Sequence, residues 1–146
     1  MKRTLLFCLL SGCSIIELGR GRPYAVWNLH GAERPAGACA TIEPRVVKSG
    51  AEGVGFVLEI RGRASCALTL AAMDMVLPDE SVQRPIAVPP MTIAPDTDVR
   101  LYAALPFDNR AAWNRGARQA TYVVRGTIDG QTFSAGPWTM DHEEIK

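Results

Sequence analysis

Hydrophobic and polar residues alternate one by one in two clear stretches of the chain. Residues 54–60 place Val54, Phe56 and further large apolar side chains at every second position. Residues 99–105 repeat this alternation with valine, leucine and alanine. Because successive side chains of a strand point to opposite faces, a period of two predicts strands with one buried face.

A β-hairpin is the strongest local prediction near the C-terminus. Residues 121–128 are rich in β-branched and aromatic side chains, and residues 131–135 resume the pattern. Asp129-Gly130 lies between them, and Asp-Gly is a preferred pair for a two-residue type I′ turn. We expect Gly136-Pro137 to end the returning strand.

The rest of the chain predicts further short strands and little helix. Extended runs are expected over residues 24–33, 39–47 and 66–76, with turns over 34–37 and 49–53. Prolines at positions 78, 85, 89, 90 and 95 confine any strands between them to sheet edges. One helical turn is expected within residues 108–118, with Asp108 or Asn109 as its N-cap.

These elements predict an all-β fold, a single antiparallel β-sandwich over residues 24–140. No sustained helical period and no internal repeat is present, and a chain of 146 residues allows one domain. Short strands separated by turns about every 8–12 residues are typical of a sandwich. Residues 141–146 are expected to form an acidic, solvated tail.

The N-terminal residues have the order of a lipoprotein signal peptide. Lys2-Arg3 precedes an apolar run over residues 4–10, and Leu10-Ser11-Gly12-Cys13 fits the lipobox of bacterial lipoprotein precursors. The pattern predicts a signal peptide over residues 1–12 and a lipid (diacylglycerol with palmitate-type chains) on Cys13. An uncleaved apolar terminus is the alternative, although a membrane-spanning helix needs about 20 apolar residues.

The residues after Cys13 predict where the protein resides. Residues 13–23 contain glycine and proline and are expected to form a short tether. Position 14 is serine rather than the aspartate that typically retains enterobacterial lipoproteins in the inner membrane. We therefore expect an outer-membrane location, with the lipid anchoring the protein so that it faces the periplasm.

Export changes the interpretation of the cysteines. Cys8 leaves with the signal peptide and Cys13 carries lipid, so Cys39 and Cys66 remain. An oxidising compartment favours a disulfide between them, and closing a loop of roughly 27 residues would contribute about 3 kcal/mol. Two buried free thiols are the alternative. No metal site is expected, because neither cysteine has a CxxC partner or a neighbouring histidine.

Composition and charge exclude a nucleic-acid partner. Hydrophobic residues make up 47% of the chain and charged residues 21%, as in ordinary globular proteins. The chain has 16 Lys and Arg, and Lys2 and Arg3 leave with the signal peptide, so 14 basic residues face 15 acidic ones. This near-neutral balance offers no electrostatic basis for binding nucleic acid.

No catalytic constellation is apparent, so we expect neither enzyme activity nor a cofactor. His30 falls in a predicted edge strand and His142 in the acidic tail, and no nucleophile–base signature accompanies them. Five carboxylates that could flank a cleft are expected to be ordinary loop residues: Asp74, Asp79, Glu80, Asp96 and Asp98. Trp27, Trp113 and Trp138 are expected to pack in the core or at strand ends.

Three segments of the chain carry a family resemblance. Residues 101–108 (LYAALPFD) precede a polar loop and then residues 122–133 (YVVRGTIDGQTF), while residues 31–38 (GAERPAGA) form an upstream turn. This layout resembles the YscW-like family of type III secretion lipoprotein chaperones, or pilotins, and their YbaY-like relatives. The likeness covers roughly residues 26–138.

The resemblance implies a β-sandwich lipoprotein that binds the C-terminal region of an outer-membrane secretin subunit. The protein would assist targeting and assembly of that subunit together with the lipoprotein-sorting machinery. A family member with a general envelope-binding role and no secretin client is the alternative. Edge strands can bind a partner segment, and residues 86–93 and the strand near Trp27 are the edge candidates; the binding face stays unassigned.

Overall fold

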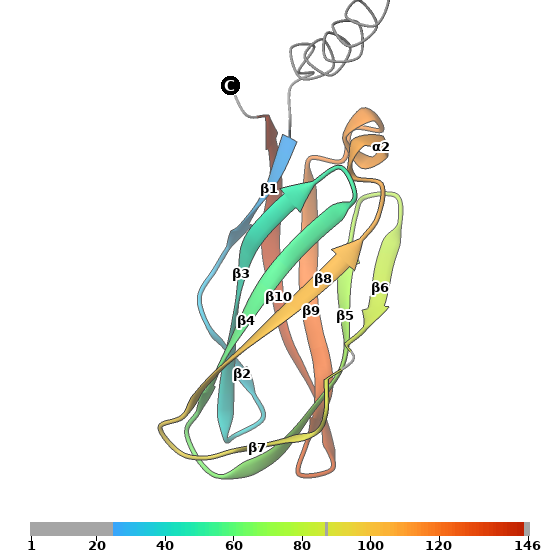
Figure 1. The fold of residues 1–146 in the computed structure, drawn as a ribbon. Helices are drawn as coiled ribbons and strands as arrows, with labels where there is room; N and C mark the ends of the chain where they lie inside the picture. Colours follow the sequence, from blue (N-terminus) through green and yellow to red (C-terminus); the bar gives the residue numbers. More distant parts are fainter. Residues whose placement is uncertain (1–24, 87, 145–146) are drawn as a thin grey trace, which may run out of the picture.

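Two antiparallel sheets packed face to face form the protein. The structure is a computed structural model that describes residues 25–86 and 88–144, which contain ten strands and one short helix (Figure 1). The predicted all-β sandwich is therefore confirmed. The expected signal peptide, the tether and the lipidated Cys13 lie outside the described residues.

The larger sheet has six strands. Its order is β1-β10-β9-β5-β6, and β7 also pairs with β5. Its strands are β1 (Ala25–His30), β5 (Cys66–Val76), β6 (Ser81–Pro85), β7 (Met91–Ile93), β9 (Gln119–Ile128) and β10 (Gln131–Glu144). The sequence prediction that the proline-rich middle of the chain lies at a sheet edge is confirmed by β6 and β7.

The smaller sheet has four strands, in the order β2-β3-β4-β8. Its strands are β2 (Arg34–Ala36), β3 (Ala40–Gly50), β4 (Gly53–Gly62) and β8 (Asp98–Pro106). The helix α2 (Asn109–Asn114) joins β8 to β9 and so connects the two sheets at the end where β1 begins (Figure 1). Asp108 caps α2 as predicted, because its side chain accepts the Ala111 N–H at 2.8 Å.

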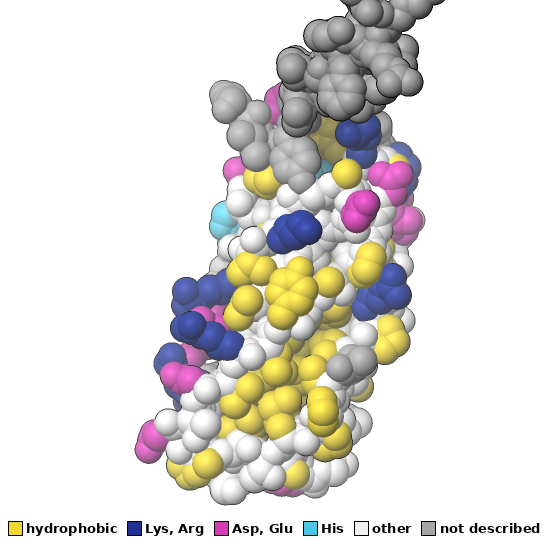
Figure 2. All heavy atoms as spheres, in the orientation of Figure 1, with side chains coloured by type: hydrophobic (Ala, Val, Ile, Leu, Met, Phe, Trp, Pro, Cys, Tyr) yellow, Lys and Arg dark blue, Asp and Glu magenta, His cyan; other side chains and the backbone are white. Residues whose placement is uncertain are grey.

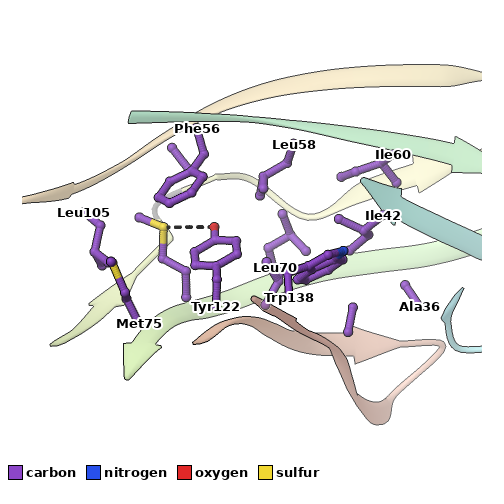
Figure 3. Packing of buried hydrophobic residues seen from close by; sticks show 14 of the residues in the cluster. Ala36, Ile42, Phe56, Leu58, Ile60, Leu70, Met75, Leu105, Tyr122 and Trp138 are labelled. Carbon is purple, nitrogen blue, oxygen red and sulfur yellow. Dashed lines mark hydrogen bonds between the residues drawn. The ribbon is translucent and has the colours of Figure 1, made fainter. Parts of the chain in front are cut away.

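Large apolar side chains from the inner faces of both sheets fill the core (Figure 3). The alternation over residues 54–60 buries Phe56 and Leu58 completely. The ring of Phe56 stacks on Tyr122 of the opposite sheet with 4.3 Å between centroids. The Tyr122 hydroxyl lies 3.4 Å from the sulfur of Met73, and burial raises the pKa of Tyr122. Cross-sheet aromatic packing thus holds the sandwich closed.

The predicted hairpin forms, but its second strand is longer than expected. Asp129 and Gly130 both have positive φ, as a type I′ turn requires. Gly136-Pro137 does not end β10; the pairing with β9 shifts register between Ala135 and Trp138 and then continues. Gly136 has a φ of 119°, and a Cβ there would lie 2.8 Å from the Tyr122 carbonyl oxygen, so glycine permits this irregularity.

The expected acidic tail is wrong for residues 141–144. These residues form the end of β10 and pair with β1, as Glu144 does with Ala25 and His142 with Trp27. Backbone pairing with the edge strand outweighs the polar composition of the segment. Residues 145–146 lie outside the described part of the chain.

One further detail differs from the sequence prediction near the start of the sandwich. Residues 34–36 are predicted to be part of a turn, but they form β2 and pair with the first residues of β3. β3 continues through Pro44, which pairs with Leu58 of β4, in agreement with the extended run predicted over residues 39–47. A proline fits inside a strand only where its missing N–H faces away from the neighbouring strand, and Pro44 has this orientation relative to β4.

A disulfide joins the two sheets at the end opposite α2. Cys39 lies in the turn between β2 and β3, and Cys66 is the first residue of β5; their Cα atoms are 6.3 Å apart. Both side chains are buried. The bond therefore links the smaller sheet to the larger one, in agreement with the predicted pairing and against the alternative of two free thiols.

Replacing Cys39 and Cys66 together by serine is expected to lower the free energy of unfolding by about 3 kcal/mol, because the cross-link restricts the unfolded chain. Urea denaturation of the oxidised protein and of the double variant measures the difference. Dithiothreitol should destabilise the parent protein and leave the double variant unchanged. Equal stability of the two oxidised proteins would contradict the expectation.

Candidate binding surfaces

The direction of backbone hydrogen bonds identifies which strand edges are unpaired. In an antiparallel sheet, the N–H and C=O of one residue point to one neighbouring strand, and those of the next residue point the other way. Gly62 donates its N–H to the Thr97 carbonyl at 2.8 Å, on the side of β8. By alternation, Leu58 and Phe56 also face β8, and their partners Leu101 and Ala103 face β4.

The first open side lies between β1 and residues 43–50 of β3, and we name it the β1/β3 side. β2 pairs only with residues 40–42 of β3, so the rest of that edge faces β1. A groove of about 570 Å³ runs between the two edges. Its lining includes Leu29 and Val46.

The β1/β3 side carries two features that reduce its capacity for strand pairing. Because Gly62 faces β8, its partner Ala40 faces away from β4, and so does Pro44 four residues later. Pro44 therefore places its missing N–H at the open edge. On the opposite edge, the Trp27 N–H donates to the Ser49 hydroxyl at 3.1 Å. Natural sheets protect their edges in such ways.

The second open side lies between β8 and the segments 81–86 and 88–91, and we name it the β8 side. β8 is the last strand of the smaller sheet, and β6 approaches it from the other sheet. By alternation, the N–H and C=O groups of Arg100, Tyr102 and Ala104 face this side. Within the described residues these groups have no hydrogen-bond partner.

A hydrophobic surface, the apolar patch, accompanies the unpaired edge of β8. Figure 2 shows hydrophobic side chains gathered over β8 and below it toward β7. Six partly buried members pack against the core: Val82, Ile86, Val88, Met91, Val99 and Leu101. Tyr102 adds a ring that is 62% exposed. Contiguous apolar surface of this kind marks interaction sites on soluble proteins.

Arg84 is a positively charged side chain beside the apolar patch. It pairs with Met73, which is buried, so the two side chains leave the same face of the larger sheet, toward the inside of the sandwich. Arg84 is nevertheless exposed, because β6 lies at the edge. No ion pair or hydrogen bond of its side chain occurs within the described residues.

Most charges on the outer face of the smaller sheet are paired with one another. Glu59 lies 3.2 Å from both Arg45 and Arg100, and Arg61 lies 3.1 Å from Asp98. Such exposed pairs contribute only about 0–1 kcal/mol each. They leave little free charge on this face for a partner.

The end of the sandwich near α2 holds a cluster of buried polar and aromatic groups. The Trp27 indole N–H donates to Asn109 Oδ1 at 2.7 Å, and Asn109 Nδ2 donates to the Gly50 carbonyl at 3.0 Å. Asn109 thus ties α2 to β1 and to the end of β3. Because both bonds are buried or partly buried, this residue stabilises the fold and is not free to bind a ligand.

His142 belongs to the same cluster, which corrects the expectation of a solvated histidine. Its ring stacks on Trp27 at 4.1 Å between centroids and meets the edge of Trp113 at 4.8 Å. Nδ1 lies 3.0 Å from the Ala117 carbonyl. Burial lowers the pKa of His142, and the positive charge of Arg118 acts in the same direction, whereas the bond to Ala117 opposes it.

The candidate carboxylates lie apart and do not form a paired site. Asp74 is bound by Arg125 and Ser81, and Asp98 by Arg61. Asp79 and Glu80 both bind Arg115. Asp96 occupies a loop position with positive φ. Each of the four bound carboxylates thus has a structural partner.

The tryptophans pack as predicted. Trp27 and Trp138 are each 1% exposed, and the Trp138 indole N–H donates to the Ala32 carbonyl at 2.8 Å. Trp113 is half-buried, with the Arg118 guanidinium 3.4 Å above its ring. His30 lies in β1, at an edge as expected, 2.9 Å from Asp141.

The described residues contain neither a cluster of metal-ligating side chains nor a helix long enough to span a membrane. No group of three or more histidine, cysteine, aspartate and glutamate side chains there could hold a metal ion. The described helix is too short and too polar to cross a bilayer. The unpaired edge of β8 with its apolar patch is therefore the candidate functional site that the geometry favours.

Sequence reasoning placed one part of this site and missed another. β7, which belongs to the expected edge segment 86–93, and β1, which contains Trp27, do lie at edges of the larger sheet. β8 was predicted as a strand, but its edge position was not, because alternation shows which face is buried and not which strands are neighbours. The only sequence feature noted near this edge is the Leu105-Pro106-Phe107 motif at the end of β8.

Asn109→Ala is expected to lower the free energy of unfolding by about 2 kcal/mol, because it leaves the buried Trp27 N–H and the Gly50 carbonyl unpaired. Asn114→Ala, at the exposed end of the same helix, is the matched control and should change stability by about 0.5 kcal/mol or less. Chemical denaturation measures both variants. Equal effects would show that Asn109 does not hold α2 in place.

His142 is expected to make stability fall at acidic pH. In the folded protein the His142 ring stays neutral at pH values below its ordinary pKa of 6.5. In the unfolded chain the same ring is already protonated at those pH values. The free energy of unfolding is thus complete above pH 6.5 and decreases as the pH falls below it. His142→Phe should remove this part of the decrease, whereas the exposed-site control His30→Gln should retain it. Melting temperatures at pH 7.5 and 5 test this; parallel losses in all three proteins would refute it.

No protein-family model, curated protein or solved structure matches this chain. The fold is therefore described by its own strand order and register. The likeness to the pilotin family accordingly stays a prediction from the sequence.

Proposed function

We propose that this chain is an outer-membrane lipoprotein that acts as a pilotin, binding a secretin subunit of a type III secretion system and assisting its targeting and assembly. The proposal combines a lipid anchor at Cys13 with a binding domain that carries out no chemistry. The observation that carries the binding part is the unpaired edge of β8 beside the apolar patch.

The lipobox supports the location. Leu10-Ser11-Gly12-Cys13 supplies small residues before the cysteine whose sulfur accepts diacylglycerol. A single acyl chain binds a membrane weakly, whereas two or three give durable anchoring. Residues 13–23, fully extended, span at most about 40 Å. The lipid would therefore keep the sandwich close to the membrane in which a secretin assembles.

The open β8 side supports the binding role. A secretin subunit that has not yet assembled exposes apolar segments, and such segments aggregate when they are unprotected. The apolar patch can cover the apolar side chains of such a segment. The unpaired groups of β8 can form hydrogen bonds with its backbone. To cover the segment until it reaches the outer membrane, the protein must bind it and must itself be carried to that membrane. The lipoprotein-sorting machinery would supply this transport.

Cys13→Ala is expected to abolish acylation and to move the protein out of the membrane fraction, because the acceptor sulfur is lost. Cys8→Ala, within the predicted signal peptide, is the matched control and should remain acylated and membrane-bound. Mass spectrometry of the native product and fractionation measure both. A parent protein with an intact Met1 or an unmodified Cys13 sulfur would overturn the lipoprotein assignment.

Deleting the gene separates a pilotin from an envelope lipoprotein without a secretin client. Loss of a pilotin should leave secretin multimers absent from the outer membrane or mislocalised, and the Cys13→Ala variant should fail to restore them. The Cys8→Ala variant should restore them fully. Normal secretin multimers in the deletion strain would exclude the pilotin role and leave the general binding role.

A further inference from the structure

The two open sides of the sandwich differ in how far they are protected. On the β1/β3 side, Pro44 removes one donor and the Ser49 hydroxyl accepts the N–H of Trp27. On the β8 side, the backbone groups of Arg100, Tyr102 and Ala104 have no partner within the described residues. An unprotected edge is a template for another strand, and in the described part of the chain β8 offers three successive outward-facing residues of this kind.

The surroundings of β8 determine which segment would fit. Every second side chain of an added strand would point between the sheets, onto Val82, Ile86, Met91 and Leu101 of the apolar patch. These positions favour apolar residues. Arg84 lies at the rim with its charge unpaired within the described residues and emerges from the same inner face as Val82. An acidic side chain facing this rim would complement it.

We infer that β8 is the docking edge of this protein, and that its occupant is an extended segment of a partner protein with apolar residues at alternate positions and a carboxylate that pairs with Arg84. The inference rests on the proposed function and deepens it, because it names the edge and the chemistry of the client segment. The segment extends the smaller sheet by backbone hydrogen bonds to Arg100, Tyr102 and Ala104.

A displayed library of random 12-residue peptides, selected on the immobilised oxidised protein, tests the chemistry. We expect enriched peptides to alternate apolar with other residues over five or more positions and to carry an acidic residue. Fluorescence anisotropy with one enriched peptide, synthesised with a dye, then gives its Kd. A selection that enriches no peptide, or only basic or non-alternating ones, would overturn the inference.

Variants at position 104 test the backbone contact. Ala104→Pro removes an N–H that faces the open side and leaves the ladder to β4 intact, so the peptide should bind about tenfold more weakly or worse. Ala104→Thr keeps the N–H and is the matched control, with a Kd within about twofold of the parent. Equal binding by the two variants would overturn the inference.

Hydrogen exchange provides a readout that needs no variant. Adding the peptide to the parent protein should slow exchange of the Arg100, Tyr102 and Ala104 amides, and leave that of the Leu29 amide on the β1/β3 side unchanged. Protection at Leu29 instead would place the peptide on the other side and overturn the inference, whether or not Ala104→Pro folds.

A charge exchange tests the rim. Arg84→Glu should weaken the acidic peptide about tenfold and favour the same peptide with lysine in place of its acidic residue. Arg110→Glu, an exposed arginine of α2 without an ion pair in the described part of the chain, is the control and should change neither Kd. If Arg84→Glu does not bind the lysine peptide more tightly than the acidic peptide, the proposed carboxylate contact is overturned.

Three further outcomes separate this inference from its alternatives and from the proposed function. A dimer in sedimentation that Ala104→Pro dissociates would identify a second copy as the occupant and overturn the inference. A second result is a deletion strain that mislocalises the secretin and in which the Ala104→Pro variant restores it fully. That result would overturn the inference and retain the pilotin role. Peptide binding at β8, together with a native product that carries no acyl chain, would retain the inference and overturn the lipoprotein assignment.

Discussion

The alternating direction of backbone hydrogen bonds governs most of what this molecule can do. Each outer strand of a sandwich satisfies only half of its N–H and C=O groups, and the other half must be met by something else. Pro44 and Ser49 meet part of this requirement on the β1/β3 side. The outward-facing N–H and C=O groups of β8 have no hydrogen-bond partner within the described residues. The proposed binding role arises from that asymmetry.

The end of the sandwich near α2 has the opposite character. There, Trp27, Asn109 and His142 bury polar atoms among aromatic rings. The Trp27 indole N–H, the Asn109 amide and His142 Nδ1 have hydrogen-bond partners, whereas the buried His142 Nε2 has none within the described residues. This end is specified by hydrogen bonds between residues distant in sequence, which fix α2 relative to β1. A surface so fully engaged with itself offers a partner little, whereas the β8 side does.

Much of the fold could be predicted from the sequence because its signals are local. The alternation around Phe56, the Asp129-Gly130 turn and the cap at Asp108 each depend on a few neighbouring residues. Three other features depend on residues that are distant in sequence: the pairing of β2, the extension of β10 past Gly136, and the burial of His142 against Trp27. The acidic composition around His142 predicted solvent exposure, and the pairing with β1 outweighed it.

The candidate site was harder to predict for the same reason. The prolines of residues 85–95 marked one border of the β8 side, since proline excludes a central strand. Nothing in the sequence of β8 showed that one of its edges is unpaired. No sequence pattern singles out Arg84, and only its register opposite Met73 shows that it shares the inner face.

The pairing of β1 with β10 has a consequence for the order of folding. β1 is the first strand of the sandwich and β10 the last, and within the described residues β1 pairs with no other strand. A chain that crosses a membrane N-terminus first therefore cannot complete the larger sheet until its final residues have arrived. Contacts between such distant residues slow folding. Under the proposed export, this late closure would keep the larger sheet incomplete while the chain crosses the membrane.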